Sequence, residues 1–378
     1  MNDLESLLAR LVSIDSVNPR LVPGARGEAE IGDFVAGWMR GRGLEVQRQD
    51  TDAPGRANVI AVAPGTGGGR SLLLNAHMDT VGVAGMRAAF EPVVRDGRLY
   101  GRGAMDTKGA LAAFMSAAAE ARALRLRGDV ILTAVVDEEY ASVGTERVVR
   151  EWKADAAIVG EPSGLQIVTE HKGFVWFQLE TAGVAAHGSL PDVGVDAILM
   201  MGKVLAALEE LGGRLRRSAP HRTLGTGSLH ASLIAGGQEL SSYPASCRLE
   251  VERRTIPGET PESAEAEIRE ALERIAKTDP RFKATLHRTF ARGSMEARRD
   301  SPIVLALAQQ VQRVTGRAAV FAGMGGWLDS ALLDGAGVPT VVLGPAGAGL
   351  HGAEEWVDLG SVEACRDIVL GTIRDFCR

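Results

Sequence analysis

Histidine and acidic residues follow several apolar runs of this sequence at the point where each run ends. His77 and Asp79 come directly after "LLLNA", residues 137–139 follow "VILTAVV", and Glu161 follows "AAIVG". The apolar runs are typical of buried strands, so the polar residues stand at the expected strand ends. These residue types can bind a metal ion or move a proton.

Two further groups belong to the same pattern. The run "TVVLG" leads into a glycine-rich loop that carries His351, and Asp106 stands in "GRGAMDTKGA" at the expected start of a helix. Each residue alone has an ordinary structural explanation, such as a helix N-cap for Asp106. In an open α/β sheet, however, ligands bind beyond the carboxyl ends of the strands. The convergence of four strand ends therefore predicts one functional site.

Several buried carboxylates at one place require a neutralising cation. Histidine and carboxylate ligands favour zinc, with cobalt and manganese as alternatives. The groups are too many for one open tetrahedral ion and suit two ions about 3.5–4 Å apart that share a carboxylate. We expect Asp106 to bridge, and two pairs to complete the two ions: His77 with Glu161, and Glu139 with His351.

Two acids remain beside these expected ligands. Asp79 is close to His77 in the sequence, and we expect it to accept the other ring N–H of that histidine. Glu138 precedes the ligand Glu139, so it is the natural general base for a bridging water.

The bulk composition excludes several classes of protein. The 378 residues carry a net charge of −6 and no long basic block, so a nucleic-acid partner is not expected. The sequence has no run of about 18 apolar residues, so a membrane span is not expected. The start, "MNDLESLLARLVSID", reads as an amphipathic helix and not as a secretory signal, which indicates a cytoplasmic protein. The three scattered cysteines, Cys247, Cys365 and Cys377, predict no disulfide framework.

The first and last parts of the chain alternate apolar strands with helices. Helices are expected over 27–40, 107–124, 144–152, 302–315 and 362–376, with a short one near 328–333. Near-continuous apolar strands between helices favour a largely parallel sheet that is covered on both faces. The glycine-rich "PGTGGGRS" precedes a strand and predicts a flexible turn, not a nucleotide fingerprint.

The middle of the chain follows another order. Strands are expected at "FVWFQLETAG", "SLHASLIAGG", "SCRLEVERRT" and "FKATLHRTF", with helices over 195–211 and 261–277. This β-α-β-β-α-β order describes a ferredoxin-like unit. We expect a domain of residues 173–289 inserted between catalytic parts 1–172 and 290–378.

The motifs together identify a family resemblance. "AHMDTV", "GRGAMDTKGA", "VVDEE", "GEPS" and "GLHGAEEWV" resemble the M20 metallopeptidases: aminoacylases, acetylornithine deacetylases, succinyl-diaminopimelate desuccinylases and glutamate carboxypeptidases. The resemblance covers essentially the whole chain. It implies a three-layer αβα, di-zinc exopeptidase-like catalytic domain with an inserted ferredoxin-like α+β lid and dimerisation domain. It assigns the same ligands and base, and implies a cis peptide after Asp106.

The resemblance extends to the inserted domain. "GVAAHGSLPDVGVDAI" is similar to the family's lid segment, which implies that His187 reaches the partner subunit's active site and stabilises the oxyanion; from the residues alone, His187 is a surface-turn histidine. In "CRLEVERRTIPGET", Arg254 is the implied ligand of a substrate carboxylate, and Arg253 is expected to face solvent. The family often has asparagine where "SSYPASC" offers Ser241.

One more segment and the reaction complete the expectations. "GMGGWLDSALL" resembles the loop that closes over substrate, with Asp329 and the backbone of Gly325–Gly326. The expected activity is hydrolysis of the amide bond of an N-acyl amino acid by a homodimer that acts on small molecules. A dipeptidase or carboxypeptidase acting on short peptides is the alternative within enzymes. A catalytically inactive binding protein of the same fold is the alternative from another class, and it predicts damaged ligands or a missing base.

Overall fold

The computed structural model describes residues 3–83 and 85–378. They divide into two compact units. The first unit holds the described residues up to Thr169, together with Ala297–Ala322 and Leu328–Arg378, and the second holds Glu170–Glu296 and Gly323–Trp327. The segment 173–289, expected as an inserted domain, lies in the second unit. The return of Gly323–Trp327 to that unit was not expected.

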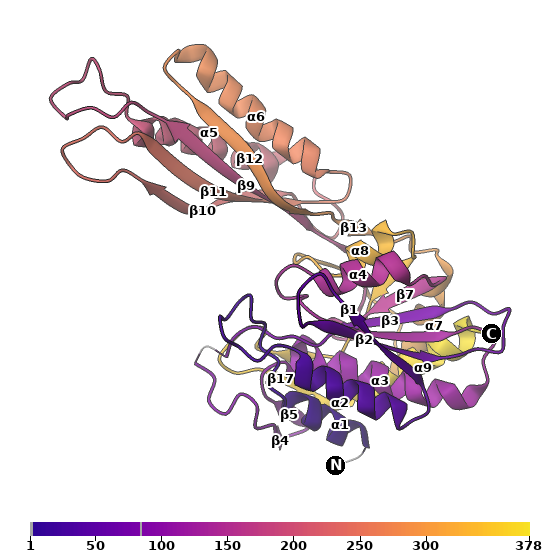
Figure 1. Ribbon diagram of the computed structural model, residues 1–378. Coiled ribbons are helices and arrows are strands. Elements are labelled where there is room, and N and C mark those ends of the chain that lie inside the picture. The colour runs from indigo at the N-terminus through magenta and orange to yellow at the C-terminus, as the bar shows by residue number, and fades with distance from the viewer. Residues whose placement is uncertain (1–2, 84) are drawn as a thin grey trace. The chain divides into compact units, whose positions relative to one another are not determined.

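The first unit is built on a mixed sheet (Figure 1). Its strand order is β1-β2-β6-β3-β7-β15-β8-β13, with β14 also beside β8. The strands are β1 (Glu45–Asp50), β2 (Ala57–Ala63), β3 (Leu72–His77), β6 (Val130–Val135), β7 (Ala156–Val159), β8 (Ile167–His171), β13 (Met295–Glu296), β14 (Phe321–Met324) and β15 (Thr340–Val342). Strands β8 and β14 continue from the first unit into the second, and β13, which pairs with the end of β8, belongs to the second unit.

The direction of the strands only partly agrees with the sequence. Strands β6, β3, β7 and β15 pair in parallel, whereas β2 pairs antiparallel with both β1 and β6, and β8 pairs antiparallel with β15 and β13. The prediction of a largely parallel sheet is therefore right for the four central strands and wrong for the outer ones. Strand β2 is apolar and mostly buried, so its composition hides its direction.

Helices cover the sheet on two sides. The helices of the first unit are α1 (Asp3–Val12), α2 (Ala29–Arg40), α3 (Gly109–Ala121), α4 (Val143–Glu151), α7 (Pro302–Thr315), α8 (Ser330–Gly335) and α9 (Leu359–Phe376). Figure 1 shows α2 and α3 on one side of the sheet and α4 and α8 on the other. The helix expected over 107–124 is α3 flanked by a π-helical turn, η1 (Ala104–Lys108), and a 3₁₀ turn, η2 (Arg122–Leu124).

A small separate sheet brings two distant loops together. Its order is β16-β17-β5-β4, from β4 (Val93–Arg95), β5 (Arg98–Tyr100), β16 (Gly347–Ala348) and β17 (Trp356–Asp358). Val357 pairs with Leu99, so the segment after β5, which carries Asp106, meets the β16–β17 loop, which carries His351. These strands are two or three residues long, and no sequence pattern predicted them.

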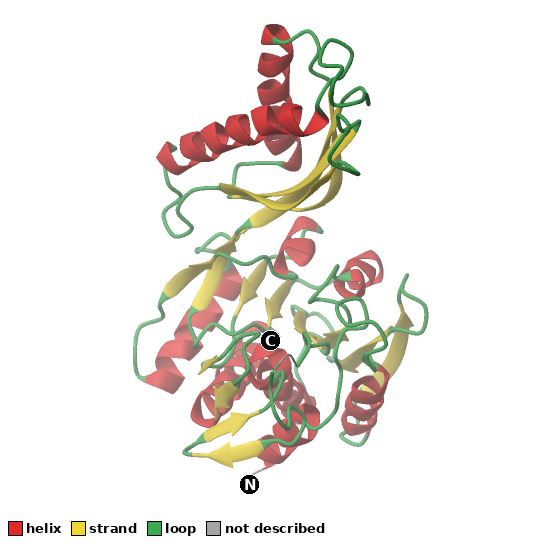
Figure 2. Ribbon diagram, turned by 90° about the vertical axis from the view of Figure 1, so that its left-hand side faces the viewer, coloured by secondary structure: helices red, strands yellow, loops and turns green. Residues whose placement is uncertain are grey.

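The second unit has the expected β-α-β-β-α-β order. It comprises β9 (Gly173–Ala182), α5 (Ala197–Arg217), β10 (Ser228–Gly236), β11 (Ser246–Thr255), α6 (Pro261–Thr278) and β12 (Ala284–Arg292). The antiparallel order β10-β11-β9-β12 is that of a ferredoxin-like sheet. Figure 2 shows both helices on one face of this sheet. Alternate residues of β9, Val175, Phe177 and Leu179, are buried in a hydrophobic core of their own.

The same alternation corrects one expectation. Arg253 was expected to face solvent but is fully buried, because it shares the face of Leu249 and Val251 on β11. Its guanidinium donates to Glu259 Oε1 at 2.8 Å and to Glu267 Oε2 at 3.1 Å, and these acids neutralise it. Its neighbour Arg254 therefore points to the other face of the strand.

Two further expectations concern chain chemistry. Cys247, Cys365 and Cys377 are buried, and each is a free cysteine. Among the described residues, no helix combines the length and apolar character needed to cross a membrane.

Candidate metal centre

The parallel strands of the first unit deliver the acidic residues and histidines to one edge of the sheet. Strand β3 ends at His77, and residues 137–139 follow the end of β6. Glu161 stands two residues after β7, and the chain beyond β15 continues into the loop of His351. The four strands are parallel, so their carboxyl ends meet at the same edge, as expected.

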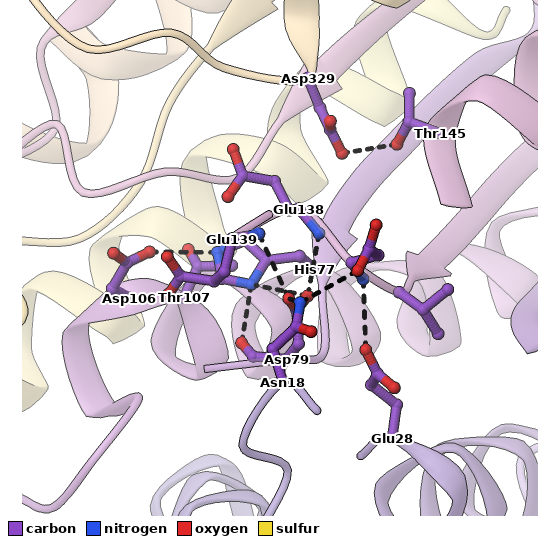
Figure 3. A network of polar contacts seen from close by, with 12 residues as sticks. Asn18, Glu28, His77, Asp79, Asp106, Thr107, Glu138, Glu139, Thr145 and Asp329 are labelled. Atoms are coloured by element: carbon purple, nitrogen blue, oxygen red, sulfur yellow. Dashed lines mark hydrogen bonds and ion pairs between the residues drawn. The ribbon is translucent and has the colours of Figure 1, made fainter. Parts of the chain in front are cut away.

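Asp106 lies between two imidazoles. Its Oδ1 is 3.1 Å from Nε2 of His77, and its Oδ2 is 3.2 Å from Nε2 of His351. Each histidine also faces a second acid: His351 Nε2 is 3.2 Å from Glu139 Oε2, and His77 Nε2 is 3.9 Å from Glu161 Oε1. Figure 3 shows Asp106 and Glu139 close to His77. The peptide bond after Asp106 is cis, as the resemblance implied.

The residues present fit a divalent cation. Ligand atoms of His77, Asp106 and Glu139 lie within 4.8 Å of one another, and so do those of His77, Glu138 and Glu161. Within the described part of the chain, the buried Oε1 of Glu139 has no hydrogen-bond donor. Buried carboxylate oxygens without donors are costly unless a cation neutralises them.

The crowding changes the protonation of the acids. Burial raises the pKa of Glu138 and of Glu161 well above the ordinary value, and each shift is increased by neighbouring carboxylates. Burial also raises the pKa of Glu139 to about 7. Without a cation, these acids therefore keep their protons to higher pH than ordinary carboxylic acids do.

The pKa values of the two histidines are raised as well, which favours their charged form. Hydrogen bonds to Asp106 and Glu139 raise the pKa of His351 to about 10. Burial opposes protonation of His77, yet Asp106 and Glu161 raise its pKa well above the ordinary value. For Asp106, burial is outweighed by the two histidines, which hold its pKa below the usual range. The cluster thus gathers protons where metal ions would supply positive charge.

Asp79 contacts the ring of His77 as expected, but through its backbone carbonyl and not through its carboxylate. The Nδ1 of His77 is 2.9 Å from the backbone carbonyl oxygen of Asp79 but 3.6 Å from its carboxylate Oδ1. The carboxylate instead accepts the backbone N–H groups of Glu138, at 3.1 Å, and Glu139, at 3.2 Å. Asp79 therefore holds the turn of the two glutamates as well as orienting the histidine through its backbone.

A second buried acid, Glu355, holds the segment of Asp106. Its carboxylate accepts the backbone N–H groups of Gly103, Met105 and Asp106 at 2.9–3.1 Å. Arg102 donates to the same carboxylate at 2.6 Å and to the carbonyl oxygen of Gly352 at 2.8 Å. One ion pair thus ties Asp106 to the residue that follows His351.

Asp329, expected in a loop over the substrate, is buried in the first unit. Its Oδ2 accepts a hydrogen bond from the Thr145 hydroxyl at 2.6 Å (Figure 3). Burial raises the pKa of Asp329 to about 6, and its charge contributes to the raised pKa of Glu138. Asp329 is therefore placed to act on Glu138 electrostatically.

The remaining predicted residues have their contacts within the second unit. His187 is exposed, with its Nδ1 2.8 Å from Ser189 Oγ, and Gly325 is exposed. Arg254 donates from Nε to Glu252 Oε1 at 2.7 Å and lies 5.2 Å from the centroid of the Phe174 ring. Ser241, which replaces the asparagine frequent in the family, is also exposed.

A mixed α/β fold with histidines and buried acids at one sheet edge defines a metallohydrolase-like protein. The chain belongs to Peptidase family M20/M25/M40, whose profile matches residues 73–375. It is therefore a hydrolytic enzyme of the metallopeptidase and amidohydrolase kind.

Three known proteins illustrate the family. An acetylornithine deacetylase from Myxococcus xanthus is 30% identical over 99% of this chain and 97% of its own length. An N-formyl-4-amino-5-aminomethyl-2-methylpyrimidine deformylase from Bacillus subtilis (strain 168) is 29% identical over 94% of this chain and 91% of its own. A dinuclear metal binding peptidase of the M20 family from Bacillus subtilis shares the fold, with a TM-score of 0.77 and 16% identity. The match covers 99% of this chain and 97% of the peptidase chain.

Proposed function

We propose that this enzyme hydrolyses the amide bond of N-acyl amino acids with two divalent metal ions. The observation that carries the proposal is the position of Asp106, whose two oxygens face different histidines, each beside its own glutamate. A carboxylate that faces two ligand groups in this way suits a shared ligand between two ions. The deacetylase and deformylase relatives both remove an acyl group, which favours the same kind of substrate.

His77 and Glu161 would hold one ion, Glu139 and His351 the other, and Asp106 would bridge them. The ligand chemistry favours zinc, with cobalt and manganese as alternatives. When bound, such a pair of ions lowers the pKa of water and polarises the substrate carbonyl.

Glu138 carries the proton transfers. Its carboxylate takes a proton from the attacking water, whose oxygen forms a bond to the amide carbon. The carbon–nitrogen bond then breaks, and Glu138 gives the proton to the departing amine nitrogen. The products are a carboxylate and a free amino acid. The proposed base is within reach of the ligand groups, since an oxygen of Glu138 lies within 4.8 Å of ligand atoms of His77 and Glu161.

The second unit supplies the remaining parts of the proposal. Residues 173–289 act as a lid and dimerisation domain inserted between catalytic parts 1–172 and 290–378. Arg254 binds the substrate α-carboxylate through its planar fork, and the backbone at Gly325 contacts the substrate. His187 of one subunit donates a hydrogen bond to the oxyanion in the other, so the working form is a homodimer. A cytoplasmic location stays a prediction.

A substrate panel tests the reaction. Purified protein loaded with zinc or cobalt is incubated with N-acetylornithine, N-succinyl-diaminopimelate, other N-acetyl and N-formyl amino acids, and dipeptides. We expect release of free amine from one or more acylated amino acids. Cleavage of dipeptides alone would instead favour the second candidate function, that of a dipeptidase or carboxypeptidase. The similarity in fold to an M20 peptidase is the observation that favours this candidate.

A variant tests the base. We expect Glu138→Gln to keep both metal equivalents and to lower kcat by at least about 10²-fold, the range of general-base contributions. Metal content by elemental analysis is the control. Turnover that survives the substitution would remove Glu138 from the reaction.

A further inference from the structure

We propose that Asn18 and Arg56 are positioning residues that hold the turn of residues 137–139 and thereby aim Glu138 and Glu139. No feature of the sequence had marked either residue. The proposal rests on the proposed function for the catalytic role of Glu138 and for the metal-ligand role of Glu139. Asn18, Arg56 and all the residues that they contact lie within the first unit.

The first link of the network is the Asp79 carboxylate. It accepts the backbone N–H groups of Glu138 and Glu139, and its Oδ2 accepts a third hydrogen bond from Nδ2 of Asn18 at 2.7 Å (Figure 3). Asp79 and Asn18 are both fully buried. A displacement of the Asp79 carboxylate therefore moves the backbone of both glutamates.

Asn18 is held in one orientation. Its Oδ1 accepts the backbone N–H of Arg20 at 2.9 Å, which turns Nδ2 toward the acids. Nδ2 donates to Asp79 and also to Oδ1 of Asp137 at 3.1 Å. The amide thus supplies both of its N–H groups to two buried carboxylates that would otherwise repel one another.

Arg56 secures the other side of the turn. It donates to Asp137 Oδ1 at 2.5 Å, and its fork pairs with both oxygens of the buried Glu28. Glu28 in turn accepts the backbone N–H of Asp137 at 3.2 Å. These contacts fix Asp137 at φ 70°, in the left-handed region that a residue with a side chain rarely adopts.

Neither Asn18 nor Arg56 makes a direct contact with the metal-ligand atoms among the described hydrogen bonds and ion pairs. Their contacts end at the carboxylates and backbone that carry Glu138 and Glu139. Small displacements of a reacting group lower reaction rates by large factors. A loosened turn should therefore have a larger effect on kcat than on the affinity for substrate.

The experiment is a double-mutant cycle between Asn18→Leu and Glu138→Gln in the full-length, metal-loaded enzyme. In the wild-type background we expect Asn18→Leu to lower kcat by about tenfold or more, with KM within about twofold. In the Glu138→Gln background we expect no further loss, because the group that Asn18 positions no longer accepts a proton.

A second measurement does not depend on activity. Asn18→Leu should make one of the two zinc equivalents dissociate at least about tenfold more readily to a chromogenic chelator, since Glu139 shares the loosened turn. Gln310→Leu is the matched control. It also removes a buried amide that donates to a carboxylate, Asp375, but this pair lies between α7 and α9. We expect it to lower stability without coupling to Glu138.

Either measurement can contradict the proposal. It is overturned when Asn18→Leu leaves kcat unchanged, lowers kcat equally on both backgrounds, or leaves zinc release unchanged. If Asn18→Leu does not fold, Arg56→Lys takes its place in the same cycle, because lysine keeps the charge but cannot serve Glu28 and Asp137 together. Full turnover by Glu138→Gln would refute the proposed base, and the zinc release would still decide whether the network positions Glu139.

Discussion

A few buried side chains at this site each serve several backbone groups. Glu355 accepts three backbone N–H groups of the segment that ends at Asp106, while Arg102 neutralises its charge. Hydrogen bonds to an ionised acceptor are stronger than neutral ones, and a buried charge whose partner is removed is costly. The pair therefore contributes both to stability and to the placement of the expected bridging ligand.

We expect Glu355→Gln to lower the free energy of unfolding by about 3 kcal/mol, because it leaves the buried Arg102 without its counter-charge. Zinc affinity should fall with it, since the backbone at Asp106 loses acceptors. Urea unfolding and chelator competition measure the two effects. The matched control, Glu120→Gln, breaks an exposed pair with Arg366 and should cost less than about 1 kcal/mol. Equal costs for the two variants would contradict the expectation.

Protonation gives a second prediction for individual residues. In the metal-free protein, the pKa of Glu139 is about 7 and the pKa of His351 is about 10. Metal ligands must be deprotonated, so binding releases protons, and affinity must rise as pH rises. Between pH 6 and 8 we expect zinc affinity to increase by about tenfold or more per pH unit. Competition with a chelator of known proton affinity measures it. A zinc affinity that does not change with pH would refute the raised pKa values. In the Glu139→Gln variant, zinc affinity should rise less steeply with pH.

The sequence predicts which histidines and acids meet at the site better than it predicts the residues that hold them in place. His77, Glu139 and Glu161 stand directly at the ends of apolar runs, so a general rule about sheet edges finds them. Asn18 and Glu355 are far along the chain from the backbone they hold, so the rule about sheet edges does not find them. The burial of Arg253 follows from strand alternation, but its acidic partners become evident only when the turn before α6 folds back.

At the scale of elements, loops that follow neighbouring strands pack closely enough to set the positions of the expected ligands. Gly344, after β15, lies against the backbone of Glu161, after β7, and a Cβ atom on it would stand 2.2 Å from the Glu161 carbonyl oxygen. Leu165 donates its N–H to the Gly344 carbonyl at 2.9 Å, which fixes this contact. No side chain fits here unless the Glu161 segment moves.

We therefore expect Gly344→Ala to lower the free energy of unfolding by about 1–3 kcal/mol, as overpacking does, and to weaken metal binding through Glu161. Thermal unfolding and bound zinc per chain measure these changes. Gly335→Ala is the control, because a Cβ there meets nothing within 4 Å. A Gly344→Ala protein with normal zinc content would show that the contact does not position the ligand.

Among the elements, the sequence predicts helices and the four central strands because their periodicity is strong. It does not predict strand direction at the outer strands, where buried antiparallel and parallel strands have the same composition. It also does not predict the small sheet of β4, β5, β16 and β17, whose pairing depends on tertiary contacts and not on local pattern.

At the scale of the whole molecule, the second unit exposes apolar residues that an isolated subunit would not favour. Leu233 and Ile234 lie on the edge strand β10, Ile198 and Leu199 begin α5, and Leu240 is fully exposed. An unpaired edge with apolar neighbours is a typical surface for pairing with a second copy. These residues support the proposed homodimer.

We expect His187→Ala and Glu138→Gln to complement each other when co-expressed. If His187 acts in the partner's site, a mixed dimer has one intact site, so about a quarter of all sites are active after random pairing. Activity per total protein measures it, with oligomeric state from light scattering. Glu138→Gln co-expressed with Glu139→Gln is the control, because no mixed dimer then has an intact site. A mixture no better than its separate components would mean that His187 does not act across subunits.

The connection between the two units limits how the chain can be cut. The backbone passes from one unit to the other after Thr169, Glu296, Ala322 and Trp327. Trp327 belongs to the short return segment, where its ring stands edge-on to His171 and Phe174 and its Nε1 donates to the Gly293 carbonyl at 3.0 Å. Excising residues 170–296 and rejoining the ends would remove His171, Phe174 and Gly293, the contact partners of the Trp327 indole. Transplanting the insert, or building a minimal hydrolase without it, therefore requires redesign of 323–327 as well.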